Sequence, residues 1–180
     1  MRVAGFLLVA LASLGVPAAV SGQDVGQKGI TMGYPESIGL LWHVTEKVAV
    51  RPEFSFAHSS TDTNLPFIDN NISSTTVSVG VSALYYLSNA DGLRPYVAPR
   101  WMYGHTGPGG GTTSHINSLG GAFGAQYALG KRFSVFGETG LTYSHATAKT
   151  DVAPLGIVDS LTTHSNTIGM HTGAGVIFYF

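Results

Sequence analysis

Residues 168–180, with the sequence IGMHTGAGVIFYF, alternate between two kinds of side chain. Counting back by twos from Phe180 gives an almost wholly apolar set, whereas the intervening residues are mostly small or polar. A period of two indicates an extended strand, because successive side chains of a strand point to opposite faces. The apolar face of this strand needs an apolar cover, which is either a second sheet or lipid.

The amino-terminal segment has the features of a secretory signal peptide. Arg2 is followed by an apolar run over residues 3–16, which is too short to span a bilayer as a helix. Small residues at Ser21 and Gly22 then suit signal peptidase. We therefore predict a cleaved signal peptide at 1–22, rather than a retained anchor, and one domain at 23–180.

The composition limits the classes of function. The chain has no cysteine, so disulfides and thiolate metal sites are excluded. Only 11% of its residues are charged, against roughly 25% in soluble globular domains, and glycine is abundant with 24 residues. The net charge is −1 without a basic patch, so no nucleic-acid partner is expected.

The alternation of residues 168–180 recurs along the chain. It is found at 38–44, 48–56, 75–87, 93–103, 118–129 and 133–144. The face opposite the apolar one carries glycine, serine and alanine with a few arginines and glutamates, which fits the crowded interior of a narrow barrel. An apolar outside and a polar inside are typical of a transmembrane barrel.

The connections between these segments alternate in length. Short turns are predicted at 46–47, 89–92 and 130–131, and long polar loops at 59–72, 105–114 and 147–163. A first strand near 26–33, closed by residues 33–37, brings the count to eight with both ends of the chain on the periplasmic side. We therefore predict an all-β fold, an eight-stranded antiparallel transmembrane up-and-down β-barrel.

The signal peptide, the alternating strands and the terminal sequence GVIFYF together resemble the small OmpA/OmpX-like outer-membrane barrels. The resemblance implies a bacterial outer-membrane location, contact with outer-membrane lipids and lipopolysaccharide, and a monomer. It also implies that Val176, Phe178 and Phe180 form the signal by which the barrel-assembly machinery recognises the last strand.

Five charged residues fall on the inward face of the predicted strands: Arg51, Glu53, Arg94, Arg100 and Glu138. Charges inside a narrow barrel are costly unless they are paired. We expect a salt-bridge network that fills and rigidifies the lumen. A narrow ion path gated by rearrangement of these arginines and glutamates is the alternative.

Five of the seven histidines fall near the outer ends of strands: His58, His105, His115, His145 and His164. Imidazole is a common metal ligand, and the pairs His105/His115 and His145/His164 lie across hairpins. Five outward positions around a circumference cannot converge on one ion, so no metal and no cofactor are expected. Contact with lipid phosphates and an ordinary interfacial role remain as alternatives.

Residues 163–166, THSN, are vaguely similar to the His-x-Ser-Asn stretch of lipid A deacylase barrels. In this chain His164 and Ser165 are adjacent, so a strand directs them to opposite faces, and no carboxylate follows Asp159. We therefore expect no enzymatic activity.

The predicted function is that of a surface scaffold with a side-chain-filled lumen, in adhesion, recognition or envelope integrity. Three alternatives are a soluble exported lipocalin-like ligand carrier, a narrow ion channel and a lipid-modifying barrel enzyme.

Overall fold

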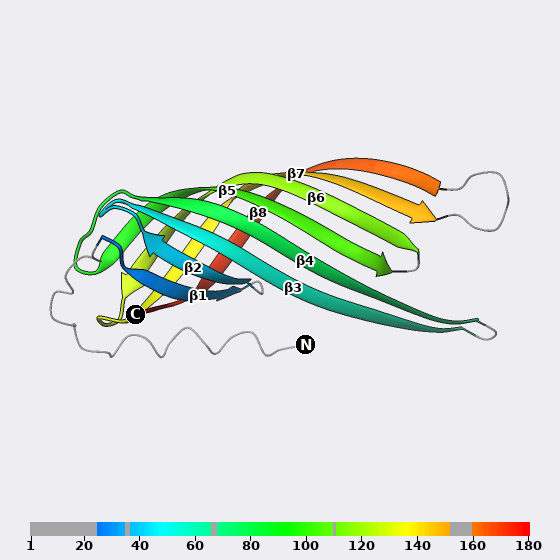
Figure 1. The fold of residues 1–180 in the computed structure, drawn as a ribbon, viewed down its shortest axis with the longest axis horizontal. Helices are drawn as coiled ribbons and strands as arrows, with labels where there is room; N and C mark the ends of the chain where they lie inside the picture. Colours follow the sequence, from blue (N-terminus) through cyan, green and yellow to red (C-terminus); the bar gives the residue numbers. More distant parts are fainter. Residues whose placement is uncertain (1–24, 35–36, 66–67, 110, 152–159) are drawn as a thin grey trace.

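The protein forms a closed barrel of eight antiparallel strands joined in chain order (Figure 1). The computed structural model describes residues 25–34, 37–65, 68–109, 111–151 and 160–180, so the predicted signal peptide lies outside the described residues. The strands are β1 (Lys28–Tyr34), β2 (Ser37–His43), β3 (Val48–Leu65), β4 (Ile68–Tyr86), β5 (Leu93–Gly109), β6 (Thr112–Ala128), β7 (Phe133–Asp151) and β8 (Ser160–Tyr179). The predicted all-β, eight-stranded antiparallel up-and-down barrel is confirmed.

The first and last strands close the wall. β1 pairs with β8 from Gly29 opposite Tyr179 to Tyr34 opposite Ala174. The backbone amide of Phe180 also donates to the carbonyl oxygen of Lys28 at 3.1 Å. The terminal alternating segment is therefore the closing strand, and its partner is the strand predicted near 26–33.

The turn between β4 and β5 follows from its sequence. Asp91 and Gly92 have φ values of 50° and 82°, and Ala90 forms a bridge with Leu93 across them. Two successive positive φ values are those of a type I′ turn, whose twist matches that of the flanking strands and which Asp-Gly favours. A short connection at this end of the barrel is therefore encoded locally.

The predicted long loops are wrong in one respect, because most of their residues belong to strands. β3 continues to Leu65, and β4 begins at Ile68 and pairs with it. The hairpins β5–β6 and β7–β8 extend into the predicted loops in the same way. The cause is that ladder hydrogen bonds are made by the backbone, so strands rich in serine and threonine pair without an apolar face. The three hairpins project well past β1 and β2 (Figure 1), and we call them the arms.

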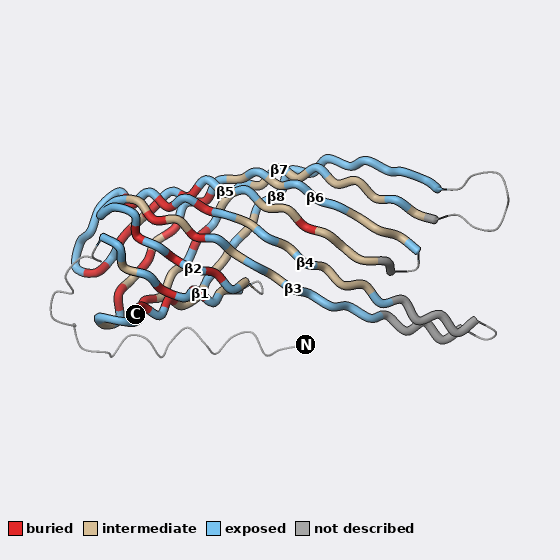
Figure 2. Tube along the Cα trace, in the orientation of Figure 1, coloured by how far each residue is buried: buried red, intermediate tan, exposed pale blue. Residues whose placement is uncertain are grey.

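Burial is confined mainly to the inside of the half barrel nearest Phe180 (Figure 2). Large apolar side chains on the outer face of the wall are exposed, among them Leu40, Phe54, Val79, Trp101, Leu119, Phe123, Leu141, Ile168 and Met170. This is the reverse of a water-soluble ligand carrier, whose outer face is hydrated.

Glycines on the inner face make room for aromatic rings from neighbouring strands. A Cβ atom at Gly124 would lie 2.5 Å from Cζ of Tyr96, and one at Gly175 would lie 2.7 Å from a ring carbon of Phe136. Both distances are shorter than van der Waals contact. The packing of Tyr96 and Phe136 therefore depends on the missing side chains.

We predict that Gly124→Ala destabilises the barrel by about 1–3 kcal/mol, because the added methyl group overpacks the lumen against Tyr96. Gly121→Ala is the matched control, since a Cβ there meets nothing within 4 Å. Urea unfolding in detergent micelles, followed by tryptophan fluorescence, measures the difference. Equal unfolding midpoints for the two variants would contradict the prediction.

Candidate functional site: the barrel lumen

A polar and aromatic cluster fills the lumen close to the short turns. We call it the aromatic layer, and its members are His43, Tyr86, Gln126 and Tyr179, from β2, β4, β6 and β8. Tyr86 donates its hydroxyl to Gln126 at 2.9 Å, and Gln126 donates to the Tyr179 hydroxyl at 2.8 Å. His43 Nε2 lies 3.2 Å from the same hydroxyl. This chain of bonds links the four even-numbered strands across the lumen.

Arg94, one of the five predicted inward charges, packs against the aromatic layer. Its guanidinium lies 3.9 Å from the ring centroid of Tyr86, and Nη2 donates to the backbone oxygen of Glu46 at 2.7 Å. Arg94 precedes Arg100 by six residues, which is about 20 Å along a strand, so the two arginines lie at different depths.

The other four inward charges form a second cluster, the charge cluster: Arg51 and Glu53 from β3, Arg100 from β5 and Glu138 from β7. Arg51 is 3.1 Å from Glu53 and 2.9 Å from Glu138. Arg100 is 3.3 Å from Glu53 and also contacts Glu138. Each charge therefore has two partners of opposite sign.

Neighbouring groups add further hydrogen bonds to the charge cluster. The hydroxyls of Tyr96 and Ser82 donate to Glu138 at 2.8 Å and to Glu53 at 3.0 Å. Arg51 also lies over the ring of Phe136, 5.2 Å from its centroid. The side chains of Arg51 and Glu138 are only 1% and 3% exposed, so their pairing offsets a large desolvation cost.

Beyond the charge cluster, on the side of the arms, the lumen is not filled. A cavity of about 390 Å³ lies there, with residues of all eight strands in its lining. Arg100 and Glu138 lie at its charged end, and Phe54, Met102 and Phe136 are among its apolar residues. The predicted side-chain-filled lumen therefore holds only for the half of the barrel near the short turns.

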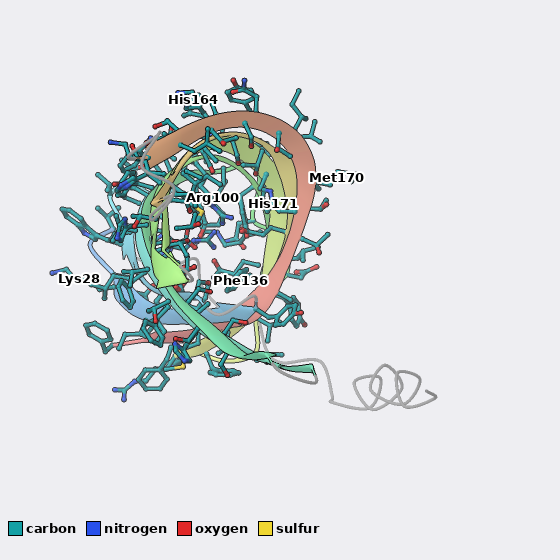
Figure 3. All side chains as sticks on the ribbon, turned by 90° about the vertical axis from the view of Figure 1, so that its right-hand side faces the viewer. Lys28, Arg100, Phe136, His164, Met170 and His171 are labelled. Carbon is teal, nitrogen blue, oxygen red and sulfur yellow. The ribbon has the colours of Figure 1, made fainter. Side chains whose placement is uncertain are left out.

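His171 is a lining residue of this cavity that sequence reasoning did not single out. Its Nδ1 lies 3.0 Å from the hydroxyl of Thr142. Its Nε2 is buried and has no hydrogen-bond partner among the described residues. Arg100, Phe136 and His171 lie within the ring of strands, whereas Met170 lies outside it (Figure 3). The alternation of β8 placed His171 on the inner face, but no residue spacing marked it as special.

The outer-end histidines lie on the arms. His105 and His115 are neighbours across β5 and β6, with Nδ1 atoms 3.2 Å apart, and the Tyr103 hydroxyl is 2.7 Å from His115. The rings of His145 and His164 stack with centroids 5.9 Å apart. Over the described part of the chain, no group of three or more potential ligands is placed to hold a metal ion.

His58 bonds to Thr75 and His164 to Thr147, across β3–β4 and β7–β8 respectively. The strand alternation of β8 directs Ser165 to the face opposite His164. The THSN stretch therefore lacks the shared face that a nucleophile and its base require.

The residues of the predicted assembly signal lie at the end of β8. Phe178 and Phe180 are exposed on the outer face and Val176 is half-buried. Phe178 pairs with Phe133 of β7 on one side and with Ile30 of β1 on the other. These residues are thus placed beside the seam at which the barrel closes.

Within the ranges that the structure describes, no α-helix has the length and apolar character to cross a bilayer.

No protein-family model matches the sequence, and the comparison with curated proteins gives no match. Solved structures with a similar fold include Acinetobacter baumannii CarO, with a TM-score of 0.44 and 13% identity over 86% of this chain and 97% of the other. A major outer membrane protein from Thermus thermophilus has a TM-score of 0.41 and 13% identity, over 86% of this chain and 98% of the other. A. baumannii CarO2 has a TM-score of 0.40 and 13% identity, over 86% of this chain and 97% of the other. These similarities concern the fold and do not say what this chain binds.

We predict that Glu138→Gln destabilises the barrel by roughly 3–5 kcal/mol, because it leaves Arg51 and Arg100 as partly unpaired buried charges. Glu46→Gln, at an exposed turn, is the control for loss of a carboxylate. The unfolding midpoint in detergent micelles measures the effect. An unchanged midpoint for Glu138→Gln would show that the charge cluster does not stabilise the lumen.

Proposed function

We propose that the chain is an integral protein of the bacterial outer membrane whose barrel anchors the three arms at the cell surface. The observation that carries this proposal is the apolar outer face of the wall. We call the exposed apolar residues of β3–β8 on this face the apolar belt; it includes Val81, Trp101, Leu119, Leu141 and Ile168. Full transfer of an apolar side chain from water to an apolar medium is worth about 1.5–3 kcal/mol, and each residue of the belt gains the share that its exposed fraction allows.

The backbone also suits a bilayer. A spanning segment must satisfy its own amide and carbonyl groups, and a closed barrel does so by pairing every strand on both sides. Over the height of the β1–β2 hairpin, strand pairing runs without interruption from β1 through β8 and back to β1. Exposed aromatic residues lie towards both ends of the wall, such as Trp42 and Phe178 at one and Trp101 and Tyr143 at the other. Amphipathic rings prefer the two membrane interfaces.

A scaffold role is supported by the division of the molecule into a rigid base and long arms. The aromatic layer and the charge cluster fill the base with interlocking bonds, so the barrel offers no wide aqueous path. The arms carry serine, threonine, asparagine and histidine on strands that project past the wall. Recognition residues commonly lie on segments that a rigid scaffold positions. We propose that the arms act in adhesion, surface recognition or envelope integrity.

The membrane position can be tested with the two tryptophans of the chain. Trp42 and Trp101 are 49% and 42% exposed on the outer face. In vesicles of brominated phosphatidylcholine we expect both to be strongly quenched, and aqueous iodide to quench them weakly. The variants Trp42→Phe and Trp101→Phe each leave one tryptophan, so the quenching of each position can be measured separately. Strong iodide quenching without bromine quenching would instead indicate a water-soluble barrel.

A second prediction concerns assembly. Phe180→Ser should reduce the amount of folded barrel in the outer membrane several-fold, because the proposed signal ends at this residue. Phe133→Ser, an exposed aromatic residue of β7 near the same rim, is the matched control. Heat-modifiable migration on a detergent gel after membrane fractionation measures folded barrel. Normal levels of heat-modifiable Phe180→Ser protein would show that the terminal ring is not part of an assembly signal.

A further inference from the structure

The wall of the barrel is shorter at β1 and β2 than along the other strands. β1 and β2 contain 7 residues each, whereas β3 and β8 contain 18 and 20. Pairing of β2 with β3 stops at Ser37 opposite Ser55, and pairing of β1 with β8 stops at Tyr34 opposite Ala174. Past these residues the described parts of β3 and β8 have no strand between them. We call this opening above the β1–β2 hairpin the lateral gap.

The lateral gap lies within the apolar belt. On β8, Met170 and Ile168 lie beyond the last residue paired with β1, and they are 77% and 76% exposed on the outer face. On β3, Phe56 lies beyond the last residue paired with β2 and is also exposed. If the proposed membrane position holds, on which this inference rests, the gap faces lipid acyl chains.

The cavity beyond the charge cluster reaches this gap. Its lining includes Tyr34 and Ser37 from the low hairpin, Phe56 from β3 and Thr172 from β8. Phe54, Phe56 and Thr172 have outward parity, so they can line an inner cavity only where it opens between their strands. The cavity is therefore accessible sideways, through the wall.

The cavity has an apolar part and a polar end. Phe54, Phe56, Met102 and Phe136 contribute apolar surface, whereas Arg100 and His171 contribute nitrogen donors. Nδ1 of His171 is engaged with Thr142, whereas Nε2 is buried without a partner among the described residues, so it reaches a ligand in the cavity when the ring turns towards it. The arginines of the charge cluster are balanced by Glu53 and Glu138, which favours a small head group over a multiply charged one.

We propose that this cavity binds a single-chain amphiphile with an oxygen head group, of the class of long-chain fatty acids, taken from the membrane through the lateral gap. The chain lies against Met102 and Phe136, and a head-group oxygen accepts a hydrogen bond from His171. A volume of about 390 Å³ lies near the lower end of the roughly 300–1,000 Å³ of ligand pockets, so one chain fits better than a two-chain lipid.

Binding can be measured with cis-parinaric acid, a fluorescent fatty acid, and barrels in phosphatidylcholine nanodiscs. We expect one saturable site per barrel above the signal of empty nanodiscs, displaced by palmitic acid. Ser118→Phe fills the cavity from β6 and should weaken binding at least tenfold. Gly121→Phe adds the same ring to the exposed outer face of β6 and should leave binding unchanged.

The head-group contact has its own test. His171→Leu should weaken displacement by palmitic acid about tenfold and leave displacement by hexadecane unchanged, and His171→Gln should restore part of the loss. Palmitic acid with a diazirine on its last carbon should label Met102 or Phe136 after irradiation. Labelling confined to outer residues such as Met170 and Leu141 would overturn the proposal.

Bromine quenching of Trp101 in the same preparations separates the two proposals. Absence of a saturable site in barrels whose Trp101 is quenched by brominated lipid overturns the amphiphile site alone. Loss of the quenching itself overturns the membrane position and the amphiphile site together.

Discussion

Closure of the wall between β1 and β8 determines how the interior is arranged. A closed barrel of eight strands is so narrow that inward side chains from opposite strands meet, and they must fill the space without collision. The even-numbered strands supply the aromatic layer, and β3, β5 and β7 supply the charge cluster. Residues from alternate strands therefore form successive layers along the barrel axis. Without the seam, neither set of residues would be brought across the lumen.

The layers differ in how they satisfy their polar groups. The aromatic layer uses neutral hydroxyl, amide and imidazole groups, whereas the charge cluster pairs two arginines with two glutamates. Buried charges of this kind are costly to break apart, because removal of one partner leaves an uncompensated ion. The hydroxyl of Tyr96 bonds to Glu138, and the ring of Tyr96 in turn requires the absence of a side chain at Gly124. The hydrogen bond to Glu138 therefore depends on the space that Gly124 leaves for the ring of Tyr96.

Alternation in the sequence was enough to predict the barrel, the closing strand and the inward face of all five charged residues. It could not predict their depth, because the height of a residue in the wall depends on strand tilt and register. Arg94 and Arg100 share a face but lie in different layers for this reason. The arms were missed because backbone pairing leaves no apolar pattern in strands that lie outside the apolar belt. The opening of the cavity depends on the unequal lengths of the strands, which no local motif records, and no residue spacing marked His171.

The low side at β1 and β2 removes any rotational symmetry from the barrel. Seen along its axis, the short β1–β2 hairpin occupies one part of the circumference and the longer strands β3–β8 occupy the rest (Figure 3). In the proposed membrane position, neighbouring molecules therefore meet different surfaces according to the direction of approach. Lipid beside the short hairpin would cover a lower wall than lipid beside β5 and β6. A barrel with this shape has a direction within the plane of the proposed membrane as well as across it.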